Sequence, residues 1–217
     1  MNMSDQILEK LFESQAKVRI LKLFLRNEKS KFTTQDVRTR TQLDPRSVVL
    51  TLEKLRDAGV LKAYTHFGRT SKVPLLRSSE IRKGVVQDKR EKTYYINPHF
   101  IFVDEMRSLV LKSSPASKSR IFNRIKGIGR IKLLALSGIF LKPDRELSRT
   151  DLLVVGDDIS EKKLNRFLKQ LEAEAGCEIQ YSVLNSDEFA YRRKMLDRFL
   201  RDIFDKPHEV LINKLGI

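Results

Sequence analysis

Hydrophobic residues recur at intervals of three and four in the first sixty residues of the chain. From Ile7 to Leu25 they form one apolar stripe, which predicts a single amphipathic helix. A second, short helix is expected after "FTT", with Thr33 or Thr34 as its N-cap and Val37 facing inward. The chain therefore opens with two helices of unequal length.

A third helix is expected in "LDPRSVVLTLEKLRDAGVLK". Asp44 is a suitable N-cap, Pro45 suits the first helical position, and Gly59 suits the end. Residues at intervals of four and three predict one buried stripe, formed by Val48, Leu52 and Leu55.

Two short segments after this helix have the composition of β-strands, residues 60–64 and 92–97. The order of three helices and a two-stranded ribbon, carried by "SQAKVRILKLFLRN", "FTTQDVRTRTQLDPRSVVLTLEKLRDAGVLK" and "KTYYINPHF", resembles the winged helix-turn-helix of prokaryotic transcriptional regulators. The resemblance covers about residues 7–112. It implies that this part of the chain binds double-stranded DNA.

A winged helix would use its third helix to read bases. With the apolar stripe facing the core, the residues left towards solvent near the start of the helix are Arg46, Ser47, Val49 and Leu50. An arginine can donate two hydrogen bonds to guanine, and an aliphatic side chain can pack on a thymine methyl group. The two adjacent aliphatic residues also suit a contact with another protein, so that alternative stays open.

The segment between the two expected strands is long for a hairpin loop and strongly basic. It could follow phosphates or enter a minor groove as the wing, or it could be a solvated insertion. The basic residues that we expect to contact phosphates are Arg69, Lys72, Lys83, Lys89 and Arg90.

The second half of the chain has a different pattern. "HFIFVDEMRSLVLKS" should be a helix that closes a domain of residues 1–112, and "SSPASKS" begins a basic linker over residues 113–130. In residues 131–217, apolar strands alternate with helices such as "SEKKLNRFLKQLEAEAG" and "SDEFAYRRKMLDRFLRDIF", with Ser160 and Ser186 as the expected caps. The chain as a whole is expected to be α+β, with a mixed α/β second domain.

This second domain resembles the minimal nucleotidyltransferase fold over about residues 121–217. In that family a Gly-Ser pair approaches the nucleotide phosphates, and two acids separated by one residue bind the metals. "LSGIF" instead places Ser137 and Gly138 in the reverse order, and "SRTDLLVVG" offers Asp151 as the second acid with Arg149 in place of the first. A third family carboxylate would correspond to Glu178, in "CEIQYSV".

The exchange of an acid for Arg149 argues against catalysis. Residues 149 and 151 share one face of a strand, so the arginine removes a metal ligand and adds a positive charge beside the other ligand. Two like unit charges about 4 Å apart repel each other by about 4 kcal/mol at an effective dielectric of about 20, so Arg149 would oppose the binding of a metal ion. We therefore expect no catalytic residue, metal or cofactor here. Arg149 could pair with Asp151 or bind an anion, and the domain could sense a nucleotide or assemble a homodimer.

The distribution of charge supports a polyanionic partner. The net charge is +15, and residues 1–130 carry all of it, with 28 Lys and Arg against 13 Asp and Glu. The alternative is a charge that serves only solubility. No apolar run is long enough for a bilayer, the N-terminal residues lack the apolar core of a signal peptide, and the single Cys177 excludes an internal disulfide. These features predict a cytoplasmic protein that does not enter a membrane.

Together these patterns predict a DNA-binding transcriptional regulator, whose second domain is an inactive nucleotidyltransferase-like sensor or assembly module. The alternatives are an active nucleotidyltransferase, or an antitoxin-like protein, that modifies an RNA or protein partner.

Overall fold

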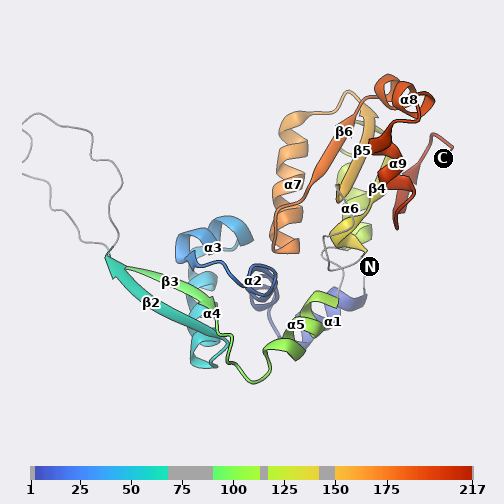
Figure 1. Ribbon diagram of the computed structural model, residues 1–217. Coiled ribbons are helices and arrows are strands. Elements are labelled where there is room, and N and C mark those ends of the chain that lie inside the picture. Colours follow the sequence, from blue (N-terminus) through green and yellow to red (C-terminus); the bar gives the residue numbers. More distant parts are fainter. Residues whose placement is uncertain (1–2, 68–89, 113–116, 142–149, 217) are drawn as a thin grey trace, which may run out of the picture.

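The chain folds into an α+β structure with two small sheets, each with its own helices and hydrophobic core (Figure 1). This computed structural model describes residues 3–67, 90–112, 117–141 and 150–216. We refer to residues 3–112 as the N-terminal unit and to residues 117–216 as the C-terminal unit. Within the described ranges, no helix is long and apolar enough to cross a membrane.

The N-terminal unit is a set of helices around a three-stranded antiparallel sheet of order β1-β3-β2. Phe32 pairs with Tyr94 and Leu61 pairs with Ile96, so both outer strands align on β3. The elements are α1 (Met3–Leu11), α2 (Gln15–Arg26), β1 (Phe32–Thr33), α3 (Thr34–Thr41), α4 (Pro45–Asp57), β2 (Leu61–Phe67), β3 (Arg90–Ile96) and α5 (Val103–Lys112).

The single helix expected from Ile7 to Leu25 is wrong, because the chain turns between α1 and α2. Glu13 has a positive φ of 54°, which ends the first helix. The Ser14 side chain then accepts a hydrogen bond from the Lys17 backbone N–H at 3.2 Å and caps the second. Apolar residues can keep the same spacing on both sides of such a turn, so their periodicity does not reveal the break between the two helices.

The caps of α3 and α4 are confirmed. Thr33 and Asp36 form a reciprocal capping box at the start of α3. The Asp44 side chain accepts from the Ser47 N–H at 2.9 Å, with Pro45 in the first turn of α4. The predicted stripe is also confirmed as buried core: Val48, Leu52 and Leu55.

The C-terminal unit is built on a four-stranded sheet of order β6-β5-β4-β7. β5 and β6 are parallel, whereas β4 is antiparallel to both of its neighbours. The elements are α6 (Lys118–Ile125), β4 (Arg130–Leu136), the 3₁₀ turn η2 (Gly138–Phe140), β5 (Leu152–Asp157), α7 (Glu161–Ala175), β6 (Tyr181–Leu184), α8 (Ser186–Lys194), α9 (Arg198–Phe204) and β7 (Glu209–Asn213).

Helices cover both faces of this sheet. Leu134 and Val154 pack in one core with α6 and α7, while Leu133 and Val155 pack in a second core with α8 and α9. The alternation follows from the two-residue period of β-strands. Consequently α7 and the α8–α9 pair lie on opposite faces of the sheet (Figure 1).

Three of the sequence expectations for this unit are corrected by the structure, and strand β7 was not expected at all. Part of the expected linker, from Lys118 on, contains α6, whose Ile121 and Ile125 are buried in the core with α7. The last expected helix is two helices, because Leu196 has a φ of 53° and Asp197 caps α9. The cap of α8 is the side chain of Asn185, which accepts from the Glu188 N–H at 2.7 Å, and not Ser186.

The two units meet where the C-terminal end of α7 reaches α2. Gly176 ends α7 with a φ of +78°. A Cβ atom at Gly176 would lie 2.6 Å from the Lys22 carbonyl carbon and 2.7 Å from the Leu23 nitrogen. The Asn27 side-chain amide donates to the Gly176 carbonyl at 2.8 Å. Glycine is thus required here both for the left-handed conformation and for the close approach of the two backbones.

Charged groups surround this backbone contact. Glu174 is buried, and its carboxylate lies 2.9 Å from a guanidinium nitrogen of Arg124 and 3.7 Å from one of Arg120. Arg19 of α2 lies at the same junction, where burial lowers its pKa and the charge of Glu174 acts in the opposite direction. A carboxylate between cations from α6 and α2 therefore links the two units.

We predict that Gly176→Ala destabilises the protein more than Gly59→Ala. Gly59 also has a left-handed φ of +79°, but a Cβ atom there would meet only a Phe100 ring carbon, at 3.8 Å. Both variants incur a conformational cost of about 1 kcal/mol or more, and only Gly176→Ala adds the backbone clash. Urea unfolding of both variants measures the difference. Equal losses in midpoint would contradict the tight packing at Gly176.

Candidate nucleic-acid interface

The start of α4 presents a mixed polar and apolar surface to solvent. Arg46 is exposed and Ser47 is half-buried, while the side chains of Val49 and Leu50 are 46% and 53% exposed. All four were predicted to face outward. The structure brings them together on the side of the helix turned away from the fully buried Val48.

A three-residue turn connects α3 to α4 and fixes the direction of the second helix. Gln42 adopts a left-handed conformation, with φ 52° and ψ 34°, and its N–H donates to the Arg38 carbonyl at 2.9 Å. Asp44 caps α4 immediately afterwards. A conformation that ends one helix and a side chain that starts the next together leave little freedom in the angle between them.

Glu53 anchors the middle of α4 to the strand β3. Its carboxylate accepts hydrogen bonds from the Lys92 ammonium at 3.0 Å and the Tyr94 hydroxyl at 2.9 Å. The hydrogen bond from Lys92 lowers the pKa of Glu53, with burial acting against it. Burial and the hydrogen bond to Glu53 raise the pKa of Tyr94 to about 12. At neutral pH the acid is therefore ionised and the phenol protonated, as this contact requires.

Sequence reasoning missed this anchor. The signal was present in β3, where Lys92 and Tyr94 are two residues apart and so share one face of the strand. Their common partner Glu53 lies 39 and 41 residues earlier in the sequence, and no local pattern indicates the pairing.

Most of the basic residues expected in the wing lie outside the described residues: Arg69, Lys72, Lys83 and Lys89. Arg90 begins β3, where it pairs with Phe67 of β2. The contribution of this segment to binding therefore stays a prediction from charge.

The carboxylate of Asp151 is used by the fold. The side chain is only 2% exposed, and its two oxygens accept hydrogen bonds from the backbone N–H groups of Ile139 and Gln180, each at 3.0 Å. It thus ties the turn after β4 to the segment that leads into β6. Ser137 and Gly138 lie at the same turn, where the Ser137 hydroxyl donates to the Thr150 carbonyl and Gly138 has a φ of 53°.

The structure places Glu178, the other carboxylate of the expected degenerate site, at the protein surface. The Glu178 side chain is 79% exposed and lies 3.7 Å from the Arg40 guanidinium of α3. Arg149 lies outside the described residues. Within the described ranges, no group of three or more His, Cys, Asp or Glu side chains is placed to hold a metal ion.

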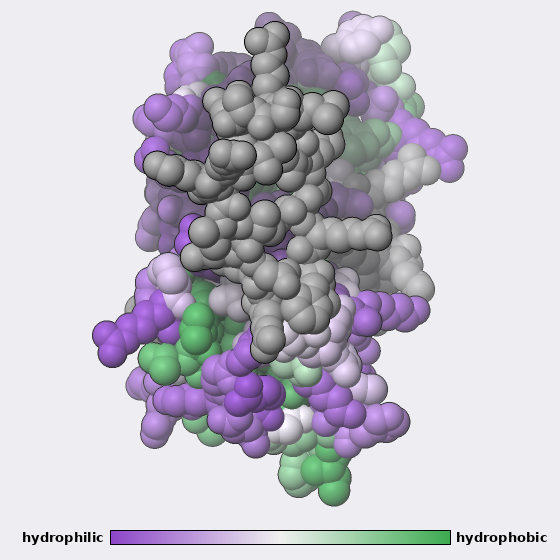
Figure 2. Space-filling view, turned by 90° about the vertical axis from the view of Figure 1, so that its left-hand side faces the viewer, coloured by the Kyte–Doolittle hydropathy of each residue, from purple (hydrophilic) through white to green (hydrophobic). Residues whose placement is uncertain are grey.

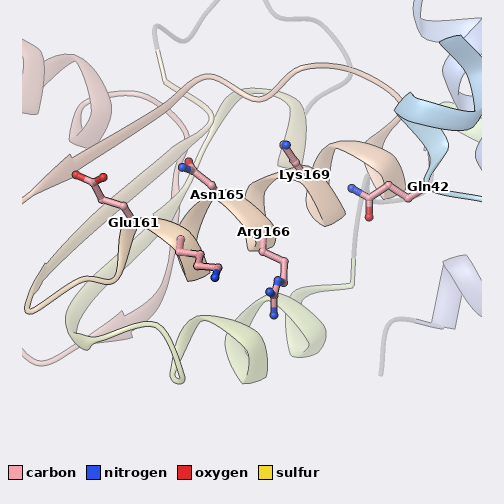
Figure 3. Close-up of a pocket in the computed structure, with 6 residues that line it drawn as sticks. Gln42, Glu161, Asn165, Arg166 and Lys169 are labelled. Carbon is pink, nitrogen blue, oxygen red and sulfur yellow. The ribbon is translucent and has the colours of Figure 1, made fainter.

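A polar hollow of about 560 Å³ runs along α7 to the turn between α3 and α4 (Figure 3). Gln42 lies at one end and Glu161 at the other, as the close-up shows. Between them lie Lys162, Asn165, Arg166 and Lys169. Sequence reasoning did not identify this hollow, although the three basic residues recur at intervals of four and three on one helix.

Comparison of the chain with protein-family models, curated proteins and solved structures gave no significant match.

The hydrogen bonds of Asp151 predict that Asp151→Asn lowers the free energy of unfolding by about 1–3 kcal/mol. The amide NH₂ would face one of the two backbone N–H groups, which would lose its acceptor inside the protein. Thermal or urea unfolding measures this loss.

The matched control is Asp158→Asn. The Asp158 side chain is exposed, pairs with Arg130 at 2.6 Å, and has a positive φ that asparagine tolerates. This variant should change stability by less than about 1 kcal/mol. If Asp151→Asn were equally mild, the structural role of Asp151 would be refuted.

Proposed function

We propose that the protein is a transcriptional regulator that binds double-stranded DNA through a winged helix-turn-helix in residues 1–112. The observation that carries the proposal is the pair α3 and α4, joined by a fixed turn, with Arg46, Val49 and Leu50 exposed at the start of the second helix. An α-helix fits the major groove of B-DNA, and the first turns of a recognition helix reach the base edges. Such a regulator would act in the cytoplasm.

The connection between α4 and the ribbon supports this proposal. In a winged helix, the recognition helix and the two strands of the wing contact one duplex together. Glu53 links α4 to Lys92 and Tyr94 of β3, so the helix and the ribbon are held in one arrangement before DNA arrives. Pre-organisation of this kind reduces the cost of ordering the binding surface.

The charge supports a polyanionic partner for the same part of the chain. Residues 1–130 carry the whole excess of +15. A surface of this sign attracts DNA at long range, and each phosphate that it neutralises releases condensed counterions. Affinity that falls steeply with salt is the expected consequence.

For the C-terminal unit we propose a nucleotidyltransferase-like domain without transferase activity, which serves in sensing or assembly. Asp151 directs both carboxylate oxygens to backbone N–H groups, so it is a poor metal ligand. Glu178 is occupied at the surface by Arg40. Neither contact favours nucleotidyl transfer, which needs acidic side chains that converge on metal ions.

We predict that Arg46→Ala weakens binding to a selected duplex by about 1–3 kcal/mol and relaxes the preference at one base position. Arginine recognises guanine through two hydrogen bonds, which alanine cannot make. The affinities of the variant for the selected duplex and for a scrambled duplex provide the measurement.

Lys54→Ala is the matched control, since Lys54 is exposed on the same helix, two turns further on. Lys54→Ala removes the same charge from a position away from the start of the helix, where we expect no base contact. Any loss of affinity should therefore be equal for the selected and scrambled duplexes. If Arg46→Ala also weakened both duplexes equally, the assignment of α4 as the recognition helix would fail.

Lys83→Ala should behave as the loss of a phosphate contact. Affinity should fall for all sequences alike, and the slope of log K against log salt should become less steep by about 1. A titration at several salt concentrations tests this. An unchanged slope would remove Lys83 from the proposed wing contacts.

A further inference from the structure

Three cations form one face of α7. Lys162, Arg166 and Lys169 are all exposed, and intervals of four and three place them on the same side of the helix. Within the described part of the chain, no ion pair joins any of them to an acidic side chain. We call these three residues the α7 basic face.

The α7 basic face leads towards the turn between α3 and α4. Because α7 ends at Gly176 against Lys22 and Leu23 of α2, the helix runs towards the N-terminal unit. Lys169 is therefore the nearest of the three cations to that unit. Gln42, which lines the same hollow, lies only two residues before the cap of α4 (Figure 3).

The exposed surface continues past this turn on α3 and α4. Arg38 is exposed and lies one helical turn before Gln42, and Arg46 is exposed four residues after it. In Figure 1, α7 forms the edge of the C-terminal unit that is nearest to α3, on the side from which β2 extends. Seen from that side, much of the visible surface is hydrophilic (Figure 2). The cations of α7 thus adjoin the surface that we assign to DNA.

Contacts at the junction fix the α7 basic face relative to α3. The Asn27 amide binds the Gly176 carbonyl at 2.8 Å, and Arg40 lies 3.7 Å from Glu178, just beyond the end of α7. These contacts join α7 to two helices of the N-terminal unit. A ligand held by α4 would therefore meet the cations of α7 at a defined place.

The spacing of the cations suits a polyanion better than a single anion. Lys169 follows Lys162 by seven positions, which corresponds to a rise of about 10 Å along the helix. Double-stranded DNA carries one negative charge per about 1.7 Å of axis, so its backbone presents several phosphates over that length. A single phosphate would need the three cations to converge on one point.

We propose that the α7 basic face binds the phosphate backbone of the duplex beside the site read by α4, so that the C-terminal unit contributes directly to DNA binding. This inference rests on the proposed function and extends it to residues outside the winged helix. The zero net charge of residues 131–217 is compatible with it, because three of their cations share one side of α7, where Glu161 is the acidic residue that lines the same hollow.

The test uses the full chain with Lys162→Gln, Arg166→Gln and Lys169→Gln combined. On a selected duplex, affinity at about 0.1 M salt should fall on the order of 10- to 100-fold, and the slope of log K against log salt should become less steep by about 2 to 3. A scrambled duplex should show the same losses, because phosphate contacts carry no sequence information. Shortening the duplex at the flank that α7 covers should weaken the wild type but not the variant.

The control combines Arg193→Gln, Lys194→Gln and Arg198→Gln, which remove the same charge from exposed positions on α8 and α9. Those helices cover the opposite face of the sheet, and salt at about 0.1 M screens long-range charge, so DNA affinity should stay within about twofold of the wild type. Unfolding midpoints of both triple variants that equal the wild-type midpoint would show that folding is unaffected.

The outcomes separate this inference from the proposed function. If the wild type binds the selected duplex and the α7 variant binds it equally well with the same salt slope, the inference is overturned and the proposed function stands. Equal losses in the α7 variant and the control would overturn it too, since only net charge would then matter. If the wild type binds no duplex at all, the proposed function itself fails.

Discussion

The arrangement of the whole molecule depends on one close contact, between the end of α7 and the backbone of α2. Gly176 brings the two main chains to a distance that no side chain allows, and Asn27 closes the contact with a hydrogen bond. Because the close approach joins the Gly176 backbone to the Lys22 and Leu23 backbone, small changes in surface side chains should not move it. It sets the direction of α7, and with it the place of every group on that helix relative to α3 and α4.

In the C-terminal unit, Asp151 also serves to hold backbone segments together. In the nucleotidyltransferase-like fold that we propose for this unit, a carboxylate at the start of the second strand would bind metal. Here the same side chain is buried and joins two backbone segments, at the N–H groups of Ile139 and Gln180. A carboxylate with both oxygens occupied in this way supports the sheet. We therefore propose that the unit acts through its surfaces and not through a catalytic centre.

Sequence patterns predicted the features that depend on neighbouring residues. The caps at Thr33 and Asp44 and the buried stripe of α4 follow from local spacing, and the structure confirms them. The helix breaks at Glu13 and Leu196 were missed, because a positive φ at a residue other than glycine has no clear local signal. The outward face of α4 was predicted correctly, whereas its role in reading bases stays a prediction.

Contacts between residues far apart along the chain could not be predicted from the sequence. Glu178 was expected beside Asp151, yet its side chain pairs with Arg40, which is 138 residues away along the chain. Strand β7 and the junction at Gly176 also depend on tertiary packing, which periodicity within one segment does not describe. The hollow along α7 could not be predicted because Gln42, more than 100 residues away along the chain, forms one of its ends.

The central claim is that this chain binds duplex DNA with sequence preference through α4. The most direct measurement selects duplexes from a random pool with the full chain, then compares the affinity for a recovered duplex with that for a scrambled one at several salt concentrations. The account predicts a recovered motif that binds about 10³-fold or more tighter than the scrambled duplex, with affinities that fall steeply as salt rises. Equal affinity for both duplexes, or affinity independent of salt, would contradict it.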